Sequence, residues 1–405
     1  MGWFDDVEAA IQPVKPCVLM GISWCRVESP RSLAGVGISY SKMSAPARPV
    51  IVVEDDPFPR LIQVLLDPDT PAARLRAFSE FFAHDLPDFV GWRERLRARL
   101  GSLYPAEVRL VRDQASLQAG LAGAHVVVVE KLAIGAREIA AANGTLRIVQ
   151  KYGTVTSNID AGACERAGVR LLTLRRRANI ACAEHALALM LALARKLTET
   201  AGLVSLEQLR AAGYAPTQYD RAHTASANWA RIGGLRTLFG RQLGIVGLGE
   251  IGREIALRAG AFGMRIVYTQ RRRLSAHEEQ RYQATYCALD ELLATSDCVS
   301  LNLPGNDATR GIIGRRELTT IKPGALLVNV SRPELVDRVA VLEALAAGRL
   351  GGFALDPPYD APGRADDPLL GFRNVIVTPH LAAAPRFNAL GDFEELLLTI
   401  AQVLA

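Results

Sequence analysis

The chain has few of the features that mark secreted, metal-binding or membrane proteins. Its 405 residues include six cysteines, which lie far apart and form no CxxC pair. This spacing argues against a zinc site or a disulfide framework, and it predicts a reducing, cytoplasmic location with no bound metal. The longest apolar run, residues 186–194, is too short to cross a bilayer, so we expect no membrane association. The N-terminus lacks a basic segment followed by an apolar one, so we expect no secretory signal.

The chain is slightly basic, but its arginine clusters lack the aromatic neighbours typical of nucleic-acid binding. The formal net charge is +5, and arginines cluster at residues 175–177 and 271–273. A nucleic-acid-binding surface usually interleaves such residues with aromatic side chains, and neither cluster does so. The composition therefore favours small anionic molecules over nucleic acid as partners.

Short apolar runs alternate with helical segments from about residue 50 onward. We interpret residues 1–47 as an irregular extension, or as an over-long start with translation beginning at Met43. The first series of strand candidates comprises residues 50–53, 108–111, 126–129, 147–150 and 169–172. The second comprises residues 243–246, 265–269, 298–303, 325–330, 352–355 and 375–378. Such alternation predicts parallel sheets covered on both faces, and the chain length predicts two domains.

Two helices are predicted, the first with approximate limits and the second with named caps. A long apolar helix, residues 181–198, separates the two series of strands. His185 lies on it and is expected to pack rather than to bind a ligand. A second helix spans residues 338–347, with Asp337 at its N-cap and Gly348 just beyond its C-cap.

Residues 247–252 read GLGEIG and follow the first strand of the second series. A lone GxGxxG is weak evidence, but here an apolar strand precedes it, while an amphipathic helix and a second strand follow. The first glycine permits a tight turn, the second lets a pyrophosphate approach the backbone, and the third lets the helix pack on the strand. The free N–H groups of the helix favour phosphate. The predicted cofactor contacts are Gly247, Gly249, Glu250, Ile251 and Gly252.

The residue at the end of the next strand indicates which dinucleotide binds. A site that prefers NAD places Asp or Glu there to bond both ribose hydroxyls. Here Gln270 is followed by Arg271, Arg272 and Arg273. Guanidinium groups bind a 2′-phosphate bidentately, whereas a carboxylate would repel it. We therefore favour NADP over NAD, with Gln270, Arg271 and Arg272 in the site; the other interpretation is a solvated turn.

Three further segments, together with the glycine loop, resemble one enzyme family. They are residues 151–160 (KYGTVTSNID), 328–337 (VNVSRPELVD) and 375–383 (VIVTPHLAA). In this order the four motifs resemble the D-isomer-specific 2-hydroxyacid dehydrogenases, from about residue 50 to the C-terminus. The resemblance implies an oxidoreductase that transfers a hydride between NAD(P)H and a small 2-keto acid or D-2-hydroxy acid, as phosphoglycerate and glyoxylate/hydroxypyruvate enzymes do.

The resemblance also implies roles for individual residues. Arg332 would bind the substrate carboxylate and polarise its carbonyl, a task suited to a planar fork of donors. His380 would act as the general acid in reduction and as the general base in oxidation. Backbone N–H groups near Thr154 and Val155 would complete the carboxylate site. Asp356, which ends the strand before the histidine motif, is expected at the cofactor.

The sequence departs from the family at the partner of the histidine. The family places a glutamate five residues after the aspartate that ends that strand, and here Ala361 occupies the position. We favour Asp360 as the replacement after a small loop adjustment, because a neighbouring carboxylate raises the pKa of a histidine and fixes its tautomer. Otherwise His380 works with less assistance, or the chain has become a non-catalytic dinucleotide sensor. Pro333 and Val155 also replace family glycines, so the substrate cannot be copied from any one member.

The resemblance implies two doubly wound α/β domains with a cleft between them. Residues 48–178, completed by residues 381–405, would form a flavodoxin-like substrate domain, and residues 179–380 a Rossmann cofactor domain. The helix at residues 181–198 and the loop after it resemble the family's dimer element, which predicts a homodimer. The first alternative is a catalytically weakened NAD(P)-binding regulatory protein of the same fold. A second, a formate-type dehydrogenase, typically has a glutamine before the histidine, and none occurs in residues 356–380.

Overall fold

The computed structural model describes residues 48–405, which form two wholly parallel sheets. The first sheet has the strand order β2-β1-β3-β4-β5, and the second has the order β12-β11-β10-β9-β6-β7-β8. The predicted N-terminal extension and the alternative start at Met43 fall outside the described residues.

The first sheet has the strand order of flavodoxin-like proteins. Its strands are β1 (Val50–Glu54), β2 (Glu107–Val111), β3 (Val126–Val129), β4 (Ile148–Lys151) and β5 (Arg170–Leu172). All four residues of β3 are buried, as expected for a β-branched run covered on both faces. The strand order reverses at β1, because β2 lies on one side of it and β3 on the other. Ligands are therefore expected at the carboxyl end of this sheet.

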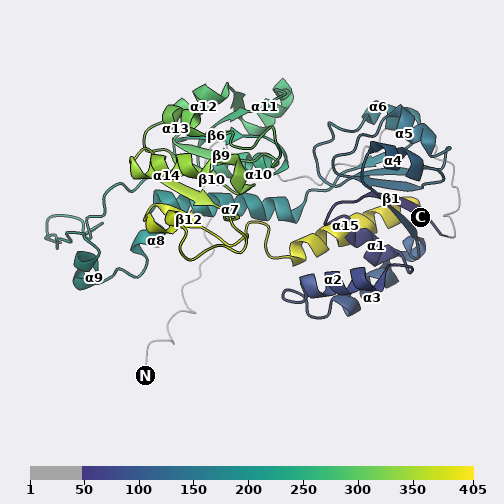
Figure 1. Cartoon of the computed structure of the whole chain (residues 1–405), viewed down its shortest axis with the longest axis horizontal. Helices are drawn as coiled ribbons and strands as arrows, with labels where there is room; N and C mark the ends of the chain where they lie inside the picture. Colours follow the sequence, from purple (N-terminus) through teal and green to yellow (C-terminus); the bar gives the residue numbers. More distant parts are fainter. Residues whose placement is uncertain (1–47) are drawn as a thin grey trace, which may run out of the picture. The chain divides into compact units, whose positions relative to one another are not determined.

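Helices cover both faces of the first sheet (Figure 1). One face carries α4 (Gln114–Gly120), α5 (Ala136–Ala141) and α6 (Ala161–Arg166). The other carries α1 (Leu61–Leu66), α2 (Ala72–Phe82), α3 (Phe89–Arg99) and the C-terminal α15 (Phe387–Leu404). The Phe393 ring of α15 stacks on Tyr152 with centroids 5.2 Å apart, and both rings are buried. The C-terminal helix therefore completes the core of this first lobe, far from its neighbours in sequence.

The second sheet has the dinucleotide-binding strand order with a seventh strand added. Its strands are β6 (Gln242–Val246), β7 (Arg265–Thr269), β8 (Ala284–Tyr286), β9 (Cys298–Leu301), β10 (Leu326–Asn329), β11 (Gly352–Leu355) and β12 (Val375–Val377). The strand order reverses between β6 and β9, so the carboxyl ends of these two strands form the switch point.

This second lobe also has helices on both faces of its sheet. One face carries α7 (Arg177–Ala194), α10 (Glu250–Ala261) and α11 (Ala276–Tyr282). The other carries α12 (Leu289–Thr295), α13 (Arg315–Thr320) and α14 (Arg338–Ala346). In the described part of the chain, α7 alone is long and apolar enough to span a membrane by length and composition. Its buried residues, such as Ala186 and Met190, pack in the same core as Ile255 of α10, which is typical of a core helix.

The predicted limits of the long helix are wrong by four residues at each end. The helix starts at Arg177, where the Asp392 carboxylate of α15 accepts a hydrogen bond from the Arg177 N–H at 2.8 Å. It ends at Ala194, because Lys196 adopts a left-handed conformation (φ 52°, ψ 38°) before α8 (Leu197–Thr200) begins. The local sequence shows neither the distant cap nor this backbone turn.

The caps of the other predicted helix are confirmed. Asp337 accepts a hydrogen bond from the Ala340 N–H at 2.8 Å at the start of α14. Gly348 has a φ of 65°, as expected for a glycine that follows the C-cap. A further short helix, α9 (Leu206–Ala211), lies in the irregular stretch before β6.

Candidate active site

The glycine loop forms the tight turn between β6 and α10 that the sequence predicts. Gly247 has a φ of 94°, and a Cβ atom there would lie 2.6 Å from the Asn302 carbonyl oxygen. A Cβ atom on Gly252 would lie 2.3 Å from the Gly247 carbonyl oxygen, so this glycine is required for the helix to pack on the turn. A Cβ atom on Gly249 would meet no atom within 4 Å, which leaves open space where a pyrophosphate would approach. The loop therefore fits a dinucleotide.

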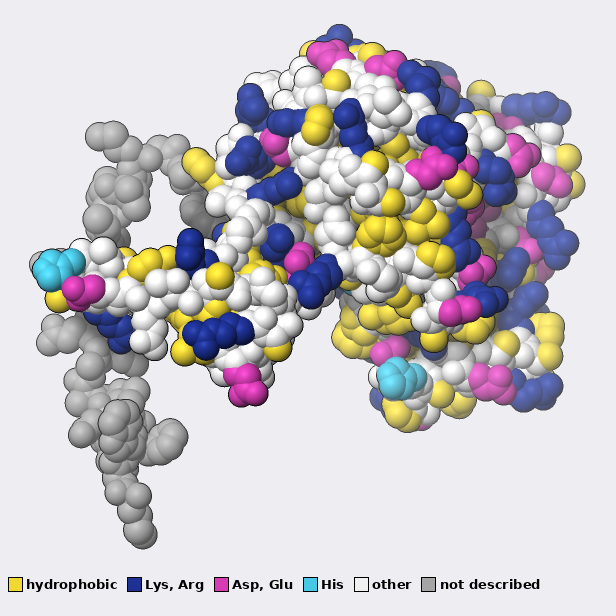
Figure 2. Space-filling view, turned by 60° about the vertical axis from the view of Figure 1, so that its left-hand side comes forward, with side chains coloured by type: hydrophobic (Ala, Val, Ile, Leu, Met, Phe, Trp, Pro, Cys, Tyr) yellow, Lys and Arg dark blue, Asp and Glu magenta, His cyan; other side chains and the backbone are white. Residues whose placement is uncertain are grey.

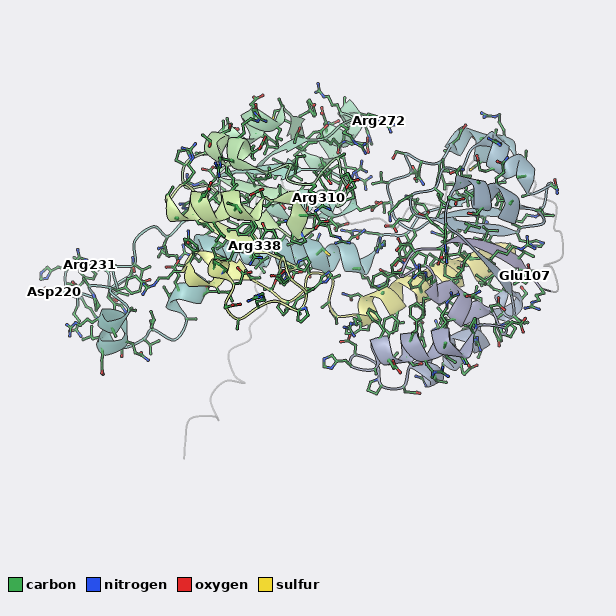
Figure 3. The ribbon with its side chains drawn as sticks, viewed as in Figure 1. Glu107, Asp220, Arg231, Arg272, Arg310 and Arg338 are labelled. Carbon is green, nitrogen blue, oxygen red and sulfur yellow. The ribbon has the colours of Figure 1, made fainter. Side chains whose placement is uncertain are left out.

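The turn after β7 lies against the glycine loop. The Gln270 Oε1 accepts a hydrogen bond from the Leu248 N–H at 3.2 Å, and its Nε2 donates to the Arg272 carbonyl at 2.6 Å. Arg273 is held elsewhere, by two hydrogen bonds of 2.9 Å to Glu279. Arg271 and Arg272 are exposed, and Figure 3 shows Arg272 pointing away from the lobe into solvent. Two of the three arginines thus stay available to a ligand.

The loop after β4 binds a carboxylate in this structure. The N–H groups of Thr154 and Val155 donate to Oε1 of Glu250 at 2.7 and 2.6 Å, and the Thr154 hydroxyl donates to Oε2 at 2.8 Å. Two successive N–H groups on one oxygen form an anion-binding nest. The predicted substrate residues Thr154 and Val155 therefore contact the glycine-loop residue Glu250, which is the first residue of α10.

Arg332 follows β10 in a turn that a buried asparagine stabilises. The Asn329 side chain donates to the Arg332 carbonyl at 2.7 Å and accepts from the Ser331 N–H at 3.0 Å. Asn329 is fully buried, whereas the Arg332 side chain is exposed. Its Nη1 donates to the Ser331 carbonyl at 2.8 Å. Sequence reasoning missed the role of Asn329, although a polar residue that ends an apolar strand is a signal that could have found it.

A buried carboxylate holds the segment that carries His380. Asp356 accepts hydrogen bonds from the Thr378 hydroxyl at 2.7 Å and from the N–H groups of Leu381 and Ala382 at 2.9 Å each. Its exposed fraction is 0 %, so the carboxylate stabilises the loop and offers no surface to a cofactor in this conformation. The Nε2 of His185 lies 3.1 Å from the Thr378 Oγ1 and extends this network, a role that sequence reasoning missed. His380 itself is exposed, with a φ of 62°.

The structure does not bring Asp360 to His380. The Asp360 carboxylate pairs with Arg338, at the start of α14, at 3.3 Å. Arg338 also pairs with Asp367 at 3.0 Å, and Figure 3 shows this arginine on the second lobe. Within residues 48–405, no hydrogen bond or ion pair joins Asp360 to His380. The physical reason is the Arg338 charge, which the local spacing of Asp360 does not indicate.

The predicted residues of the second lobe share one end of its sheet. Residues 247–252, Arg332 and His380 all follow the carboxyl ends of strands. At the opposite, amino-terminal end of β6, β9 and β10 lies a cavity of about 250 Å³ that includes Arg236, Asp297 and Lys322. None of the predicted residues lines that cavity. Within the described range, no three His, Cys, Asp or Glu side chains meet in a group that could hold a metal.

Comparisons with known proteins agree with the sheet order and the motifs. The family model for the D-isomer specific 2-hydroxyacid dehydrogenase, NAD binding domain, matches residues 187–382. A glyoxylate reductase of Aeropyrum pernix is 36% identical over 241 residues, which are 60% of this chain and 68% of that protein. A D-3-phosphoglycerate dehydrogenase of Archaeoglobus fulgidus is 32% identical over 263 residues, which are 64% of this chain and 46% of that protein.

Solved structures show the same fold. The PH0520 protein from Pyrococcus horikoshii OT3 has a TM-score of 0.51 at 24% identity, covering 88% of this chain and 91% of that one. The apo form of D-mandelate dehydrogenase from Rhodotorula graminis has a TM-score of 0.51 at 21% identity, covering 87% of this chain and 93% of that one. At these identities the likeness concerns the fold alone.

Proposed function

Since the chain belongs to the D-isomer specific 2-hydroxyacid dehydrogenase family, we propose that it transfers a hydride between a nicotinamide cofactor and C2 of a small 2-keto or D-2-hydroxy acid. One observation carries the proposal to the residues of this chain. The N–H groups of Thr154 and Val155 bind the carboxylate of Glu250, which belongs to the glycine loop and opens α10. A carboxylate site beside a dinucleotide site is what the reaction requires.

The cofactor would lie at the carboxyl end of the second sheet, across β6 and β9. Gly249 leaves open space for the pyrophosphate, Gly247 and Gly252 permit the tight turn and the packing of α10 on it, and the N-terminus of α10 supplies N–H groups and positive potential. The bound nicotinamide supplies or accepts the hydride at its C4 atom. The other tasks, which are to hold the acid and to move a proton, fall on side chains of this chain.

We propose NADP as the preferred cofactor. Arg271 and Arg272 are exposed next to Gln270, whereas the side chain of Arg273 is paired with Glu279. An NAD-preferring site would need a carboxylate at residue 270 for the ribose hydroxyls. The two guanidinium groups instead support binding of a 2′-phosphate.

The remaining roles belong to Arg332 and His380. Arg332 would bind the substrate carboxylate together with the nest at Thr154 and Val155, and would draw charge toward the carbonyl oxygen. His380 would donate the proton to that oxygen in reduction and remove it in oxidation. The network of Asp356 and Thr378 supports the loop that presents the imidazole.

The alternative is a catalytically weakened NAD(P)-binding regulator, and one observation favours it. Because Asp360 pairs with Arg338, no carboxylate assists His380 in the part of the chain that the structure describes. Without a carboxylate to orient the imidazole, proton transfer by His380 would be slower.

Steady-state assays with glyoxylate, hydroxypyruvate and pyruvate, each with NADPH and with NADH, test the proposal. We expect turnover of at least one acid, and a loss of at least about 100-fold in kcat for His380→Ala, the usual size of a general acid–base contribution. His223→Ala, in an exposed turn outside the site, is the matched control and should behave like the unchanged protein. Tight cofactor binding without turnover of any 2-keto acid would establish the regulator instead.

We propose a homodimer in a reducing compartment that binds neither nucleic acid nor membranes. Exposed apolar side chains that follow α7, namely Leu197 at the start of α8 and Val204 after it, support the dimer, and the four free cysteines of residues 48–405 support the compartment. Figure 2 shows Lys and Arg side chains interspersed with Asp and Glu rather than gathered in one basic surface. Light scattering on the purified protein gives the mass of the assembly directly.

A further inference from the structure

The side chain of Glu250 occupies the loop that we assign to the substrate carboxylate. Its two oxygens take the N–H groups of Thr154 and Val155 and the Thr154 hydroxyl, at 2.6–2.8 Å. The two N–H groups are those that the sequence predicts at the substrate carboxylate. Since each bond also has an ionised acceptor, all three are of the strong, charge-assisted kind.

We propose that Glu250 is a built-in competitor of the substrate, whose carboxylate holds the Gly153–Val155 loop until the cofactor binds. It thereby makes the binding of a keto acid depend on the presence of the cofactor. The inference rests on the proposed function, because it takes this loop to be the substrate carboxylate site.

The space and the charges around the loop suit a carboxylate, whether it belongs to Glu250 or to a substrate. A Cβ atom on Gly153 would lie 2.6 Å from Oε1 of Glu250, so the glycine provides the space for a close anion. Lys151 is buried beside the loop, and burial lowers the pKa of its ammonium group while Glu250 acts in the opposite direction. Glu130 and Glu54 act on Lys151 in the same direction as Glu250, and a substrate carboxylate in the loop would take over the contribution of Glu250.

The coupling to the cofactor follows from the position of Glu250 in the chain. It is the first residue of α10, and the N-terminus of α10 is the proposed pyrophosphate site. A pyrophosphate bound there would lie at the same end of α10 as the Glu250 carboxylate, and the two negative charges would repel each other. Arrival of the cofactor favours conformations in which the Glu250 carboxylate moves away, and this frees the nest for the substrate. By linkage, ligands that both displace Glu250 strengthen each other's binding.

Calorimetric titration of oxalate, an unreactive dicarboxylate, tests the inference. We expect the unchanged protein to bind oxalate about tenfold or more tightly with saturating NADP⁺ than without it, which corresponds to one lost charge-assisted contact. In Glu250→Ala, oxalate should bind the cofactor-free protein about as tightly as it binds the unchanged protein with cofactor. NADP⁺ alone should also bind Glu250→Ala more tightly, because no contact has to break and the repulsion is gone.

A residue that only held the loop in place would behave differently, since its removal would weaken the binding of both ligands. Glu250→Gln keeps the shape and removes the charge, so it should show the same direction of change as Glu250→Ala. Glu184→Gln is the matched control. The exposed Glu184 carboxylate of α7 contacts Arg258 of α10, the helix that Glu250 opens, but it does not contact the loop, so this substitution should leave both affinities unchanged.

Two results would overturn the inference: no gain in oxalate affinity in either Glu250 variant, or an undiminished dependence on NADP⁺. These outcomes are independent of turnover. A chain that binds oxalate as described yet reduces no 2-keto acid would contradict the proposed function and leave the competition by Glu250 standing.

Discussion

The contacts of some residues of the site are made within their own strand and helix, and the contacts of others are made with distant parts of the chain. The glycines of the GLGEIG loop take the conformations that their positions predict, because each is required by contacts within the same strand–turn–helix unit. Asp360 shows the opposite case. Its spacing suggested a partner for His380, but its carboxylate pairs with Arg338, which is brought near by the fold and not by the local sequence.

Asp356 and Glu250 illustrate the same limit. Both are predicted at the cofactor, and in this structure the Asp356 side chain is bonded inside the His380 loop while the Glu250 side chain is bonded to the loop after β4. A carboxylate can bind whichever N–H groups the fold brings to it. Sequence therefore predicts the residue types at the site better than it predicts their partners.

At the same scale, Gln270→Asp should shift cofactor preference toward NAD. The new carboxylate would repel a 2′-phosphate and bond the ribose hydroxyls, so the ratio of kcat/KM for NADPH to that for NADH should fall by about tenfold or more. Arg272→Ala should lower the same ratio, whereas Arg273→Ala, whose guanidinium is held by Glu279, should change it little. An unaltered ratio in Gln270→Asp would show that the arginine turn does not bind a 2′-phosphate.

Helices and strands were predicted best where the sequence pattern is continuous. The core strands β3 and β11 have the predicted residues, because runs of residues buried on both faces leave little choice. The strand β7 also has the predicted residues, although only Ile266 and Tyr268 in it are buried. The three-residue edge strand β8 was missed, since so short a segment carries no pattern. The ends of α7 were misplaced because a residue of α15 caps one end and a left-handed lysine breaks the other.

The glycine that follows the C-terminus of α14 leads to a prediction about the stability of the fold. Gly348 has a φ of 65° with open space around it, so an added methyl group meets no clash and only the backbone conformation is penalised. Gly348→Ala should lower the free energy of unfolding by about 1 kcal/mol. Gly371→Ala, at a glycine with open space and no positive φ, is the control and should be neutral or slightly stabilising. Chemical denaturation measures both, and equal effects would argue against a left-handed Gly348.

For the whole molecule, the sequence predicted two doubly wound sheets but not how the chain ties them together. The order of the strands could be inferred only from the family resemblance, because the sequence of a parallel strand does not indicate which strands lie beside it. The segment between β5 and α7 is held by Arg175, whose Nε and Nη2 donate to Glu254 of α10 at 2.6 and 2.7 Å. Nothing in the local sequence of either residue indicates this pair.

The Arg175–Glu254 pair leads to a prediction about pH. Burial raises the pKa of the Glu254 carboxyl, but hydrogen bonds from Arg175 and Arg258 outweigh it and hold the pKa below its ordinary value. A carboxyl with a depressed pKa in the folded state stabilises the protein above its unfolded pKa, and this contribution is lost as the pH falls through the folded value. The difference in unfolding free energy between the unchanged protein and Glu254→Gln should therefore shrink below about pH 4.5.

Glu207→Gln provides the control for this pH series, because Glu207 is exposed on α9 and outside the network. Its difference from the unchanged protein should stay near zero throughout. A Glu254→Gln difference that does not vary with pH would contradict the assignment of the pair.

Isotope transfer tests directly whether a hydride passes from the nicotinamide to C2 of a 2-keto acid. The protein is incubated with glyoxylate and NADPH that carries deuterium at both C4 positions, and the product is analysed by mass spectrometry. Direct transfer should give glycolate with one deuterium on C2, and none on C2 when unlabelled NADPH is used in deuterated water. Failure to form the alcohol from any of the three 2-keto acids, or a C2 hydrogen drawn from solvent, would contradict it.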